Sequence, residues 1–214
     1  MRGRSFLLAP WHAIVRGYLR LIDPVVVLCL RLGVSPNALT LIGTGVALLV
    51  GVMFAAGRMH LAGWTLGLLA FFDVIDGAVA RRSGRTSRFG GFLDSTMDRV
   101  ADGALSGGIV LFYATHPHPS GRGPLMLAVA LLALVAIQLT SYTRAKADLL
   151  GVDLAGVGWF ERPERITLLA APQAFFGLRW EWMVFDGVVA LLALTAVVTV
   201  VQRLRHVARA LYLS

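Results

Sequence analysis

Asp73–Asp98, DVIDGAVARRSGRTSRFGGFLDSTMD, places four carboxylates at the facing ends of two long apolar segments. A charged side chain inside a bilayer is costly, so carboxylates at such positions indicate function. Asp73 and Asp76 are i,i+3 and Asp94 and Asp98 are i,i+4, so each pair shares one face of its helix. Because a short polar loop joins the two segments, we expect the four side chains to converge in one cavity. Clustered hard oxygen ligands, with no His or Cys nearby, favour Mg²⁺, Mn²⁺ or Ca²⁺.

The composition is that of a membrane protein. Of the 214 residues, 57% are hydrophobic and 15% are charged, and the mean hydropathy is +0.73. The net charge of +8 does not indicate nucleic acid as a partner, because the basic residues lie between apolar segments and not on one soluble module. The single Cys29 excludes an internal disulfide. His12 and Arg16 interrupt the N-terminal apolar run, so we expect no removable signal peptide.

Six apolar segments approach the length of about 20 residues that a bilayer core requires. They cover roughly 37–56, 61–81, 93–114, 124–148, 163–178 and 182–203. Residues 5–22 are too polar to span and predict an interfacial helix. We therefore predict an all-α polytopic membrane protein with six transmembrane helices and an N-terminal interfacial helix. Because the fifth segment is short, five spans with a re-entrant fifth segment is the alternative.

The chain divides into three parts on this interpretation. An N-terminal interfacial segment covers 1–34, a six-helix domain covers 35–205, and a short C-terminal tail covers 206–214. Ser35-Pro36-Asn37 is a strong start for the first span, with a serine cap and a proline at the first helical position. Two glycine pairs are candidate close helix contacts. They are Gly63-x-x-x-Gly67 and Gly103-x-x-x-Gly107.

The positions of Arg and Lys predict the orientation. With Arg99 left out because it lies inside the third span, sixteen basic residues flank one set of span ends and three flank the other. The positive-inside rule then places both termini and all the acid-bearing ends in the cytoplasm. The expected location is the cytoplasmic membrane of the cell, with the site open to the cytoplasm.

A second charged cluster lies on the same side as the aspartates. It consists of cations at the ends of the last three spans: Arg144, Lys146, Arg162, Arg165 and Arg203. These side chains predict an anion site beside the aspartates. The alternative is topology alone, with cationic helix ends held on the cytoplasmic side. For the aspartates, the corresponding alternative is simple pairing with nearby arginines: Arg81, Arg82, Arg88 and Arg99.

The pattern around the aspartates resembles a known family signature. Asp73-x-x-Asp76-Gly77-x-x-Ala80-Arg81, eight further residues and Gly90-x-x-x-Asp94-x-x-x-Asp98 fill every fixed position of the CDP-alcohol phosphotransferase motif. The resemblance implies a membrane enzyme that transfers a phosphatidyl or similar group from a CDP-linked donor to an alcohol and releases CMP. It also implies that all four aspartates bind metal, with Asp98 as the general base. Two Mg²⁺ ions, with Mn²⁺ possible, and a homodimer are expected on the same basis.

The physical chemistry of the motif agrees with a donor site for CDP-diacylglycerol. Gly77 and Ala80 allow close approach of the nucleotide and pyrophosphate to the helix backbone. Arg81 offers a forked donor to phosphate oxygens. The resemblance further implies that Ser35, Pro36, Asn37 and Ala38 lie beside the donor head group and that Ser87 belongs to the loop over the nucleotide. With Gly77, Ala80 and Arg81, these are the residues expected at the donor.

The segments SYTRAKA (141–147) and ERPER (161–165) resemble elements of the phosphatidylinositol-phosphate synthases and their archaeal ether-lipid relatives. In that group these cations hold the phosphate of inositol 1-phosphate, which implies an acceptor site made of Ser141, Arg144, Arg162, Arg165 and Arg203. Arg144 stands where Lys is usual and Lys146 where Arg is usual, which keeps the charge and changes the geometry.

The expected reaction is transfer of the phosphatidyl group of CDP-diacylglycerol to a hydroxyl of inositol 1-phosphate, giving phosphatidylinositol phosphate. Glycerol 3-phosphate is the alternative acceptor, because it also needs a cationic pocket. A function from a different class is a divalent-cation carrier that uses the four aspartates as a transport site. A carrier predicts acids near the midplane of the bilayer and a broken helix there, whereas these acids lie near one face.

Overall fold

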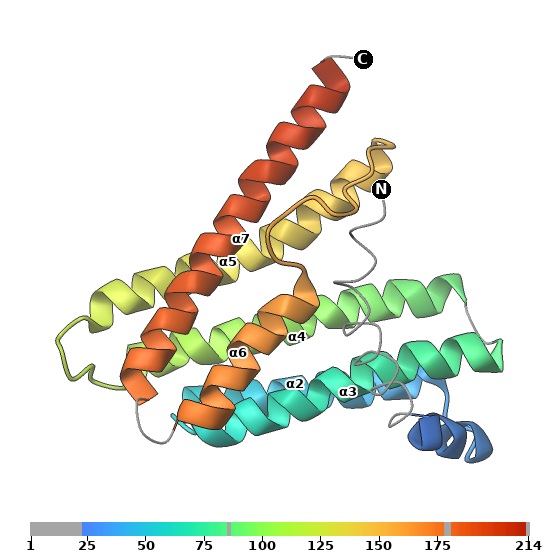
Figure 1. Ribbon diagram of the computed structural model, residues 1–214, viewed down its shortest axis with the longest axis horizontal. Helices are drawn as coiled ribbons and strands as arrows, with labels where there is room; N and C mark the ends of the chain where they lie inside the picture. The colour runs from blue at the N-terminus through green and yellow to red at the C-terminus, as the bar shows by residue number, and fades with distance from the viewer. Residues whose placement is uncertain (1–22, 85–86, 178–180, 213–214) are drawn as a thin grey trace, which may run out of the picture.

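The computed structural model describes residues 23–84, 87–177 and 181–212, and every regular element in these ranges is helical (Figure 1). After a helical stretch at 23–31, the helices are α2 (Pro36–Ala55), α3 (Met59–Ser83), α4 (Arg88–Thr115), α5 (Gly123–Leu149), α6 (Arg162–Phe176) and α7 (Glu181–Tyr212). The all-α prediction is confirmed for the described part of the chain, and each of α2–α7 overlaps one expected apolar segment. α7 continues to Tyr212 through residues expected to form a tail. The predicted interfacial helix at 5–22 lies outside the described residues.

Capping fixes where the helices start and stop at the end of the molecule that carries the motif. The Ser35 hydroxyl accepts a hydrogen bond from the Ala38 N–H at 3.2 Å, with Pro36 in the first turn of α2. The Ser87 hydroxyl accepts from the Gly90 N–H at 2.9 Å and caps α4 in the same way. α3 ends at Gly84, whose φ of +67° is the left-handed conformation that commonly terminates helices. The serine cap predicted for α2 is therefore confirmed.

The helices close into a ring. α2 packs on α3 and α4, α4 packs on α5, α5 on α7, α7 on α6, and α6 returns to α3. In Figure 1, α2, α3 and α4 run alongside one another, and α5 and α7 lie together on the other side of the molecule. This arrangement brings the start of α4 and α6 and the end of α5 and α7 toward one end of the ring.

Backbones touch where α2 crosses α4. A Cβ added at Gly51 would lie 2.4 Å from the carbonyl oxygen of Ala104, and one added at Gly108 would lie 2.1 Å from the carbonyl oxygen of Gly51. Real Cβ atoms do not approach backbone oxygens so closely, so only glycine fits at these positions.

Only one of the four glycines singled out in the sequence makes such a contact. A Cβ at Gly63 would lie 2.3 Å from the backbone nitrogen of Ala174 on α6. Gly67 and Gly107 face open space, and a Cβ at Gly103 would meet only the end of the Gln138 side chain, at 3.2 Å. The pattern of spacing therefore located the contact at Gly63 but missed the α2–α4 crossing.

We expect Gly108→Ala to destabilise the protein and Gly107→Ala to leave it as stable or more stable. Both changes add a good helix former, worth up to about 1 kcal/mol, but only the methyl at 108 collides with backbone. Overpacking of this kind costs typically about 1–3 kcal/mol. Thermal unfolding in detergent should show a lower midpoint for Gly108→Ala alone, and equal midpoints for the two variants would contradict the close crossing.

The helices have the surface of a membrane protein. α2 (Pro36–Ala55), α5 (Gly123–Leu149) and the Trp182–Tyr212 part of α7 are long and apolar enough to cross a bilayer. Large apolar side chains on these helices, such as Leu48, Leu132 and Leu194, are exposed. Since a soluble protein rarely exposes so much contiguous apolar surface, we conclude that this is an integral membrane protein.

The end of the ring remote from the motif is held together by aromatic packing and a polar network. The rings of Phe54 and Phe185 stack at 5.8 Å. Next to them, Asp186 of α7 accepts a hydrogen bond from the Tyr113 hydroxyl at 2.8 Å, and its other oxygen lies 2.9 Å from His118 Nε2. These contacts tie α4 and the loop that follows it to the start of α7.

Candidate active site

A cavity of about 970 Å³ opens between α4, α5, α6 and α7 where α4 and α6 begin. Seven of the residues predicted from the sequence line it: Asp94, Asp98, Ser141, Arg144, Arg162, Arg165 and Arg203. The structure thus brings two of the four motif aspartates together with the whole predicted acceptor cluster. These residues come from four helices, and the first and last of them, Asp94 and Arg203, are more than 100 positions apart in the sequence.

Asp98 faces the arginines across this cavity. Its Oδ1 lies 2.9 Å from Arg162 Nη1, and its Oδ2 lies 3.9 Å from Arg99 Nη2. The Asp98 side chain is 25% exposed and Asp94, one turn earlier, is exposed. Asp98 can therefore meet both a dissolved ligand and a cation from α6. Pairing with Arg99, one of the alternatives raised by the sequence, is present but is the longer of the two contacts.

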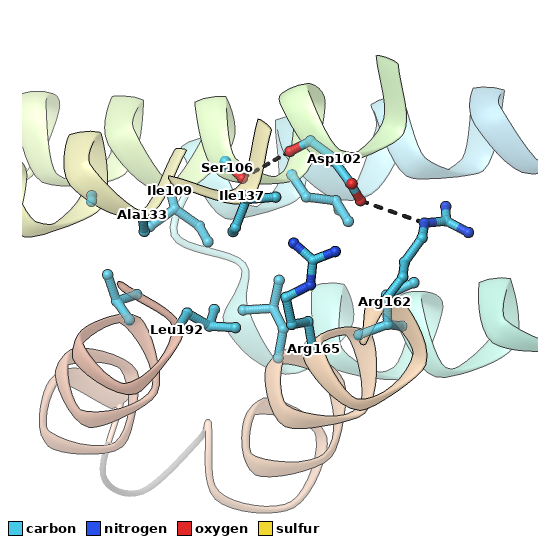
Figure 2. A pocket seen from close by; sticks show the side chains of 13 residues that line it. Asp102, Ser106, Ile109, Ala133, Ile137, Arg162, Arg165 and Leu192 are labelled. Carbon is cyan, nitrogen blue, oxygen red and sulfur yellow. Dashed lines mark hydrogen bonds and ion pairs between the residues drawn. The ribbon is translucent and has the colours of Figure 1, made fainter. Parts of the chain in front are cut away.

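Asp102 continues the row of carboxylates one turn deeper. Its side chain is only 7% exposed, and it lies 3.3 Å from Arg99 Nη2 and 3.5 Å from Arg162 Nε. Figure 2 shows Asp102 above Arg162 and Arg165, with its contact to Arg162 dashed. A buried carboxylate among several guanidinium groups offsets their mutual repulsion, so Asp102 helps to hold the cationic cluster together.

Arg165 and Arg203 are the buried members of the cluster. Arg165 Nη1 donates to the Thr140 hydroxyl at 3.3 Å. Arg203 donates from Nη1 to the Thr140 carbonyl and from Nε to the Val157 carbonyl at 3.1 Å. One residue of α5 therefore contacts guanidinium groups from both α6 and α7.

Figure 2 shows a second, much smaller cavity of about 30 Å³. The two share Arg162 and Arg165, and the walls of the small one are mainly aliphatic, including Ile109, Ile137 and Leu192. The arginines thus separate a polar cavity from an apolar interior.

The remaining cations of the C-terminal half differ in their surroundings. Arg144 lines the large cavity and is exposed. Lys146 is exposed, and its Nζ lies 5.8 Å from the centre of the Tyr142 ring. This distance allows a cation–π interaction on the surface of α5.

The residues predicted at the donor lie at the same end of the ring, on α2, α3 and α4. A Cβ at Gly90 would meet Ser87 Oγ at 3.1 Å and Asn37 Oδ1 at 3.4 Å, so the first turns of α2 and α4 lie against each other. Ser35, Pro36 and Ala38 belong to that first turn of α2 or its cap.

On α3, the side chain of Arg81 lies over Gly77, with Nη1 3.2 Å from where a Cβ at Gly77 would be. Arg81 is exposed and can reach a ligand there. Asp73, Asp76 and Ala80 belong to α3, but their side chains lie outside the described part of the structure.

Two of the predicted metal ligands, Asp94 and Asp98, belong to the described residues. Asp94 and Asp98 present carboxylate oxygens on one face of α4 at a polar cavity, which is the donor chemistry that Mg²⁺ or Mn²⁺ prefers. Among the side chains that the structure describes, no group of three or more His, Cys, Asp or Glu is close enough to hold a metal ion. The donors present fit a divalent cation, and metal binding by the four motif aspartates stays a prediction.

Asp102 and Thr140 contact the arginines of the site but were not predicted from the sequence. Asp102 follows Asp98 at the same i,i+4 spacing that links Asp94 to Asp98, so the extended row was a usable signal. Thr140 carries no such signal, because a threonine in an apolar helix is common and its role depends on two arginines far along the chain.

The fold and the site define a class of protein: a helical membrane protein with carboxylates beside an arginine cluster, suited to phosphate-bearing ligands. Residues 33–202 match the CDP-alcohol phosphatidyltransferase family. The chain belongs to this family, which confirms the family expected from the motif. The motif aspartates and the arginine cluster apart from Arg203 lie within the matched residues, which cover most of the chain.

Individual relatives are similar over two thirds of the chain or more. The phosphatidylinositol phosphate synthase of Streptomyces avermitilis is 36% identical over 198 residues, covering 90% of this chain and 80% of the relative. The archaetidylinositol phosphate synthase of Pyrococcus horikoshii is 39% identical over 144 residues, covering 67% of this chain and 71% of the relative.

Solved structures are similar in fold as well. The crystal structure of the Mycobacterium tuberculosis phosphatidylinositol phosphate synthase with CDP-DAG bound has a TM-score of 0.78 and 33% identity, covering 88% of this chain and 94% of that one. The structure of the same enzyme in complex with manganese and citrate also gives a TM-score of 0.78 and 33% identity, covering 87% and 88%.

Proposed function

We propose that this protein transfers the phosphatidyl group of CDP-diacylglycerol to a hydroxyl of inositol 1-phosphate, releasing CMP and forming phosphatidylinositol phosphate. The observation that carries the proposal is the single cavity that Asp98 shares with Arg144, Arg162, Arg165 and Arg203. A phosphate held by the arginines keeps the rest of a small acceptor within reach of the carboxylate. Family membership and relatives that make inositol lipids support the same assignment.

Each residue has a part in the reaction. Asp98 takes the proton from an acceptor hydroxyl, and the hydroxyl oxygen attacks the phosphorus that bears diacylglycerol. The bond between that phosphorus and the bridging oxygen of the diphosphate breaks, and CMP leaves with the bridging oxygen. The arginines bind the phosphate of the acceptor, which is not itself changed.

The donor lies along α2, α3 and α4 in this proposal. Ser35, Pro36, Asn37 and Ala38 contact the donor head group, Gly77 and Ala80 admit the nucleotide, and Arg81 and Ser87 contact its phosphates or the loop over it. Asp73, Asp76, Asp94 and Asp98 hold two divalent cations, with Mg²⁺ preferred and Mn²⁺ an alternative. Bound cations neutralise charge on the diphosphate.

The direct test is CMP release by the purified protein from CDP-diacylglycerol, with acceptors compared side by side. Inositol 1-phosphate should give the highest kcat/KM. Glycerol 3-phosphate is the second candidate, because the arginines recognise a phosphate and not a ring. Free inositol and serine should be poor acceptors. If activity is highest with glycerol 3-phosphate, that compound is the acceptor in place of inositol 1-phosphate. Metal uptake by liposomes that contain the protein, without any CMP release, would favour a divalent-cation carrier.

Removing divalent cations should abolish CMP release. Chelation with excess EDTA leaves the diphosphate without counter-charge, so we expect a loss of at least about a hundredfold, since a metal supplies several kcal/mol to such a reaction. Adding back Mg²⁺ or Mn²⁺ should restore the rate, and Ca²⁺ should restore it less, because it takes longer and more variable ligand distances. Unchanged turnover in EDTA would contradict the metal assignment.

The wider arrangement follows from the same proposal. All six helices α2–α7 cross the membrane, both termini and the cavity face the cytoplasm, and the enzyme works in the cell membrane as a homodimer. Residues 35–205 form the catalytic domain, between an N-terminal interfacial segment (1–34) and a C-terminal segment (206–214). The charge bias of the loops supports this orientation, because it puts the arginine-rich ends and a water-soluble acceptor on the same side.

A further inference from the structure

Arg165 is one of the two buried cations, with Arg203, that line the large cavity proposed to bind the acceptor, called here the acceptor cavity. It is only 9% exposed, and it lies on the first turn of α6 where the polar cavity meets the apolar interior. Within the described part of the chain, the hydrogen-bond partner of its guanidinium group is the Thr140 hydroxyl, at 3.3 Å. A buried guanidinium group with so few partners depends strongly on each of them.

Thr140 is itself fixed in place. It is 2% exposed, and its hydroxyl donates to the Ile137 carbonyl at 2.7 Å. Because the proton of the hydroxyl is used there, the oxygen presents its lone pairs to Arg165. The Thr140 carbonyl accepts from Arg203 and from the Thr143 hydroxyl. The orientation of the Thr140 hydroxyl is therefore set by its hydrogen bond within α5, and Arg203 adds a contact to the Thr140 backbone.

Besides the Thr140 hydroxyl, the surroundings of Arg165 are mainly aliphatic side chains and the charge of Asp102. Figure 2 shows its guanidinium group between α6 and α4, with Ile137, Ile109 and Leu192 around the small apolar cavity beside it. Asp102 lies above it in the same view and is already in contact with Arg162. Without the Thr140 hydroxyl, the guanidinium group would turn toward Asp102 or toward the open cavity.

We propose that Thr140 is a positioning residue for the acceptor: its hydroxyl holds Arg165 in the orientation that binds the acceptor phosphate. The inference rests on the proposed function of the cavity. Arginine has many rotamers, and a donor held in advance binds its anion more tightly than one that must be ordered on binding. Thr140 borders the large cavity but is only 2% exposed, and its hydroxyl is engaged by the Ile137 carbonyl and Arg165, so we infer that it acts through Arg165.

The test is a hydroxyl series at position 140. Thr140→Val keeps the shape of the side chain and removes the hydroxyl, so the KM for inositol 1-phosphate should rise about tenfold to a hundredfold, the range expected for a hydrogen bond to a charged group. The KM for CDP-diacylglycerol and kcat at saturating acceptor should change by less than about twofold, within the scatter of a neutral substitution. Thr140→Ser restores the hydroxyl and should restore the KM for inositol 1-phosphate.

Thr195→Val is the matched control. Thr195 is 1% exposed in the same bundle, and its hydroxyl donates to carbonyls of its own helix, Leu191 and Leu192. The substitution removes a hydroxyl group from a buried site that contacts no arginine. All kinetic constants should therefore stay near those of the parent protein. If Thr140→Val lowers the unfolding temperature more than Thr195→Val does, Thr140→Ala provides a second variant without the hydroxyl.

A double-mutant cycle separates positioning from a general structural effect. In an Arg165→Ala background, Thr140→Val should leave kcat/KM for the acceptor unchanged, because the residue through which it acts is gone. An undiminished effect in that background would overturn the proposal, and so would a normal KM for the acceptor in Thr140→Val itself.

The outcome also separates this inference from the proposed function. If the parent protein releases no CMP with any acceptor, the proposed function fails, and the binding of inorganic phosphate measured by calorimetry then tests Thr140 by itself. The proposal requires weaker phosphate binding in Thr140→Val and recovery in Thr140→Ser. Equal binding by the parent and both variants would overturn it.

Discussion

Asp98→Asn should reduce turnover by roughly 10²–10⁴, the contribution expected of a general base, and leave binding of CDP-diacylglycerol nearly intact. The amide keeps the shape of the side chain but cannot take a proton from the acceptor hydroxyl. Asp98 lines the acceptor cavity and contacts Arg162 at 2.9 Å. Its carboxylate therefore lies next to an arginine that is proposed to bind the acceptor phosphate. CMP release in single-turnover experiments, together with donor binding, measures the two effects separately.

Asp153→Asn is a suitable control for this change. Asp153 lies in the loop between α5 and α6 and accepts a hydrogen bond from the Ala155 N–H at 2.8 Å, which an asparagine oxygen can also accept. Its activity should match that of the parent protein. Near-normal CMP release by Asp98→Asn would remove Asp98 as the base and leave it, at most, a metal ligand.

The fold was largely predictable because apolar length and capping are local properties. Ser35-Pro36-Asn37 predicted the start of α2, and the stretches of about 20 apolar residues predicted the helices. The order of helices around the ring was not predictable, because it depends on which surfaces fit together. The contact of Gly51 with Gly108 illustrates the difficulty: each is an ordinary helical glycine until the other helix is placed against it.

The candidate site was predictable where charge repeats with helical spacing. Asp94 and Asp98 stand four residues apart, and the arginines of α5, α6 and α7 mark helix ends on one side, so their meeting in one cavity could be expected. The contact of Asp98 with Arg162 could not, because it joins α4 to α6 across the cavity. Hydrogen bonds such as that from Arg165 to Thr140 depend on tertiary distance alone.

The cations proposed for the acceptor site are not equivalent in the structure. From the sequence, one common role in binding the acceptor phosphate is expected for Arg144, Arg162, Arg165 and Arg203. In the structure Arg144 is exposed, Arg162 contacts two carboxylates, and Arg165 and Arg203 are buried and held by neutral oxygens. An arginine whose charge is not matched by a contacting carboxylate retains more of its attraction for a phosphate. Arg165 and Arg203 are therefore the stronger candidates for phosphate recognition.

Arg165→Ala should consequently show the largest effect on the acceptor. Loss of a charge-assisted contact to phosphate is worth about 3 kcal/mol, which is on the order of a hundredfold in kcat/KM for inositol 1-phosphate. The KM for CDP-diacylglycerol should change little, because the residues proposed to bind the donor belong to α2, α3 and α4 or to the caps of these helices. Steady-state kinetics with each substrate varied in turn measures the two KM values independently.

Arg165→Lys and Arg205→Ala sharpen the interpretation of that result. Lysine keeps the charge but loses the planar fork, so it should recover only part of the affinity for the acceptor. Arg205 is an exposed cation on the same side that does not line the cavity, and its loss should have little effect. Equal losses in Arg165→Ala and Arg205→Ala would mean that the basic helix ends attract anions only through their summed charge. A larger rise in the KM for the donor than for the acceptor in Arg165→Ala would place Arg165 at the diphosphate, and the phosphate of the acceptor would then have to bind at Arg144 or Arg203.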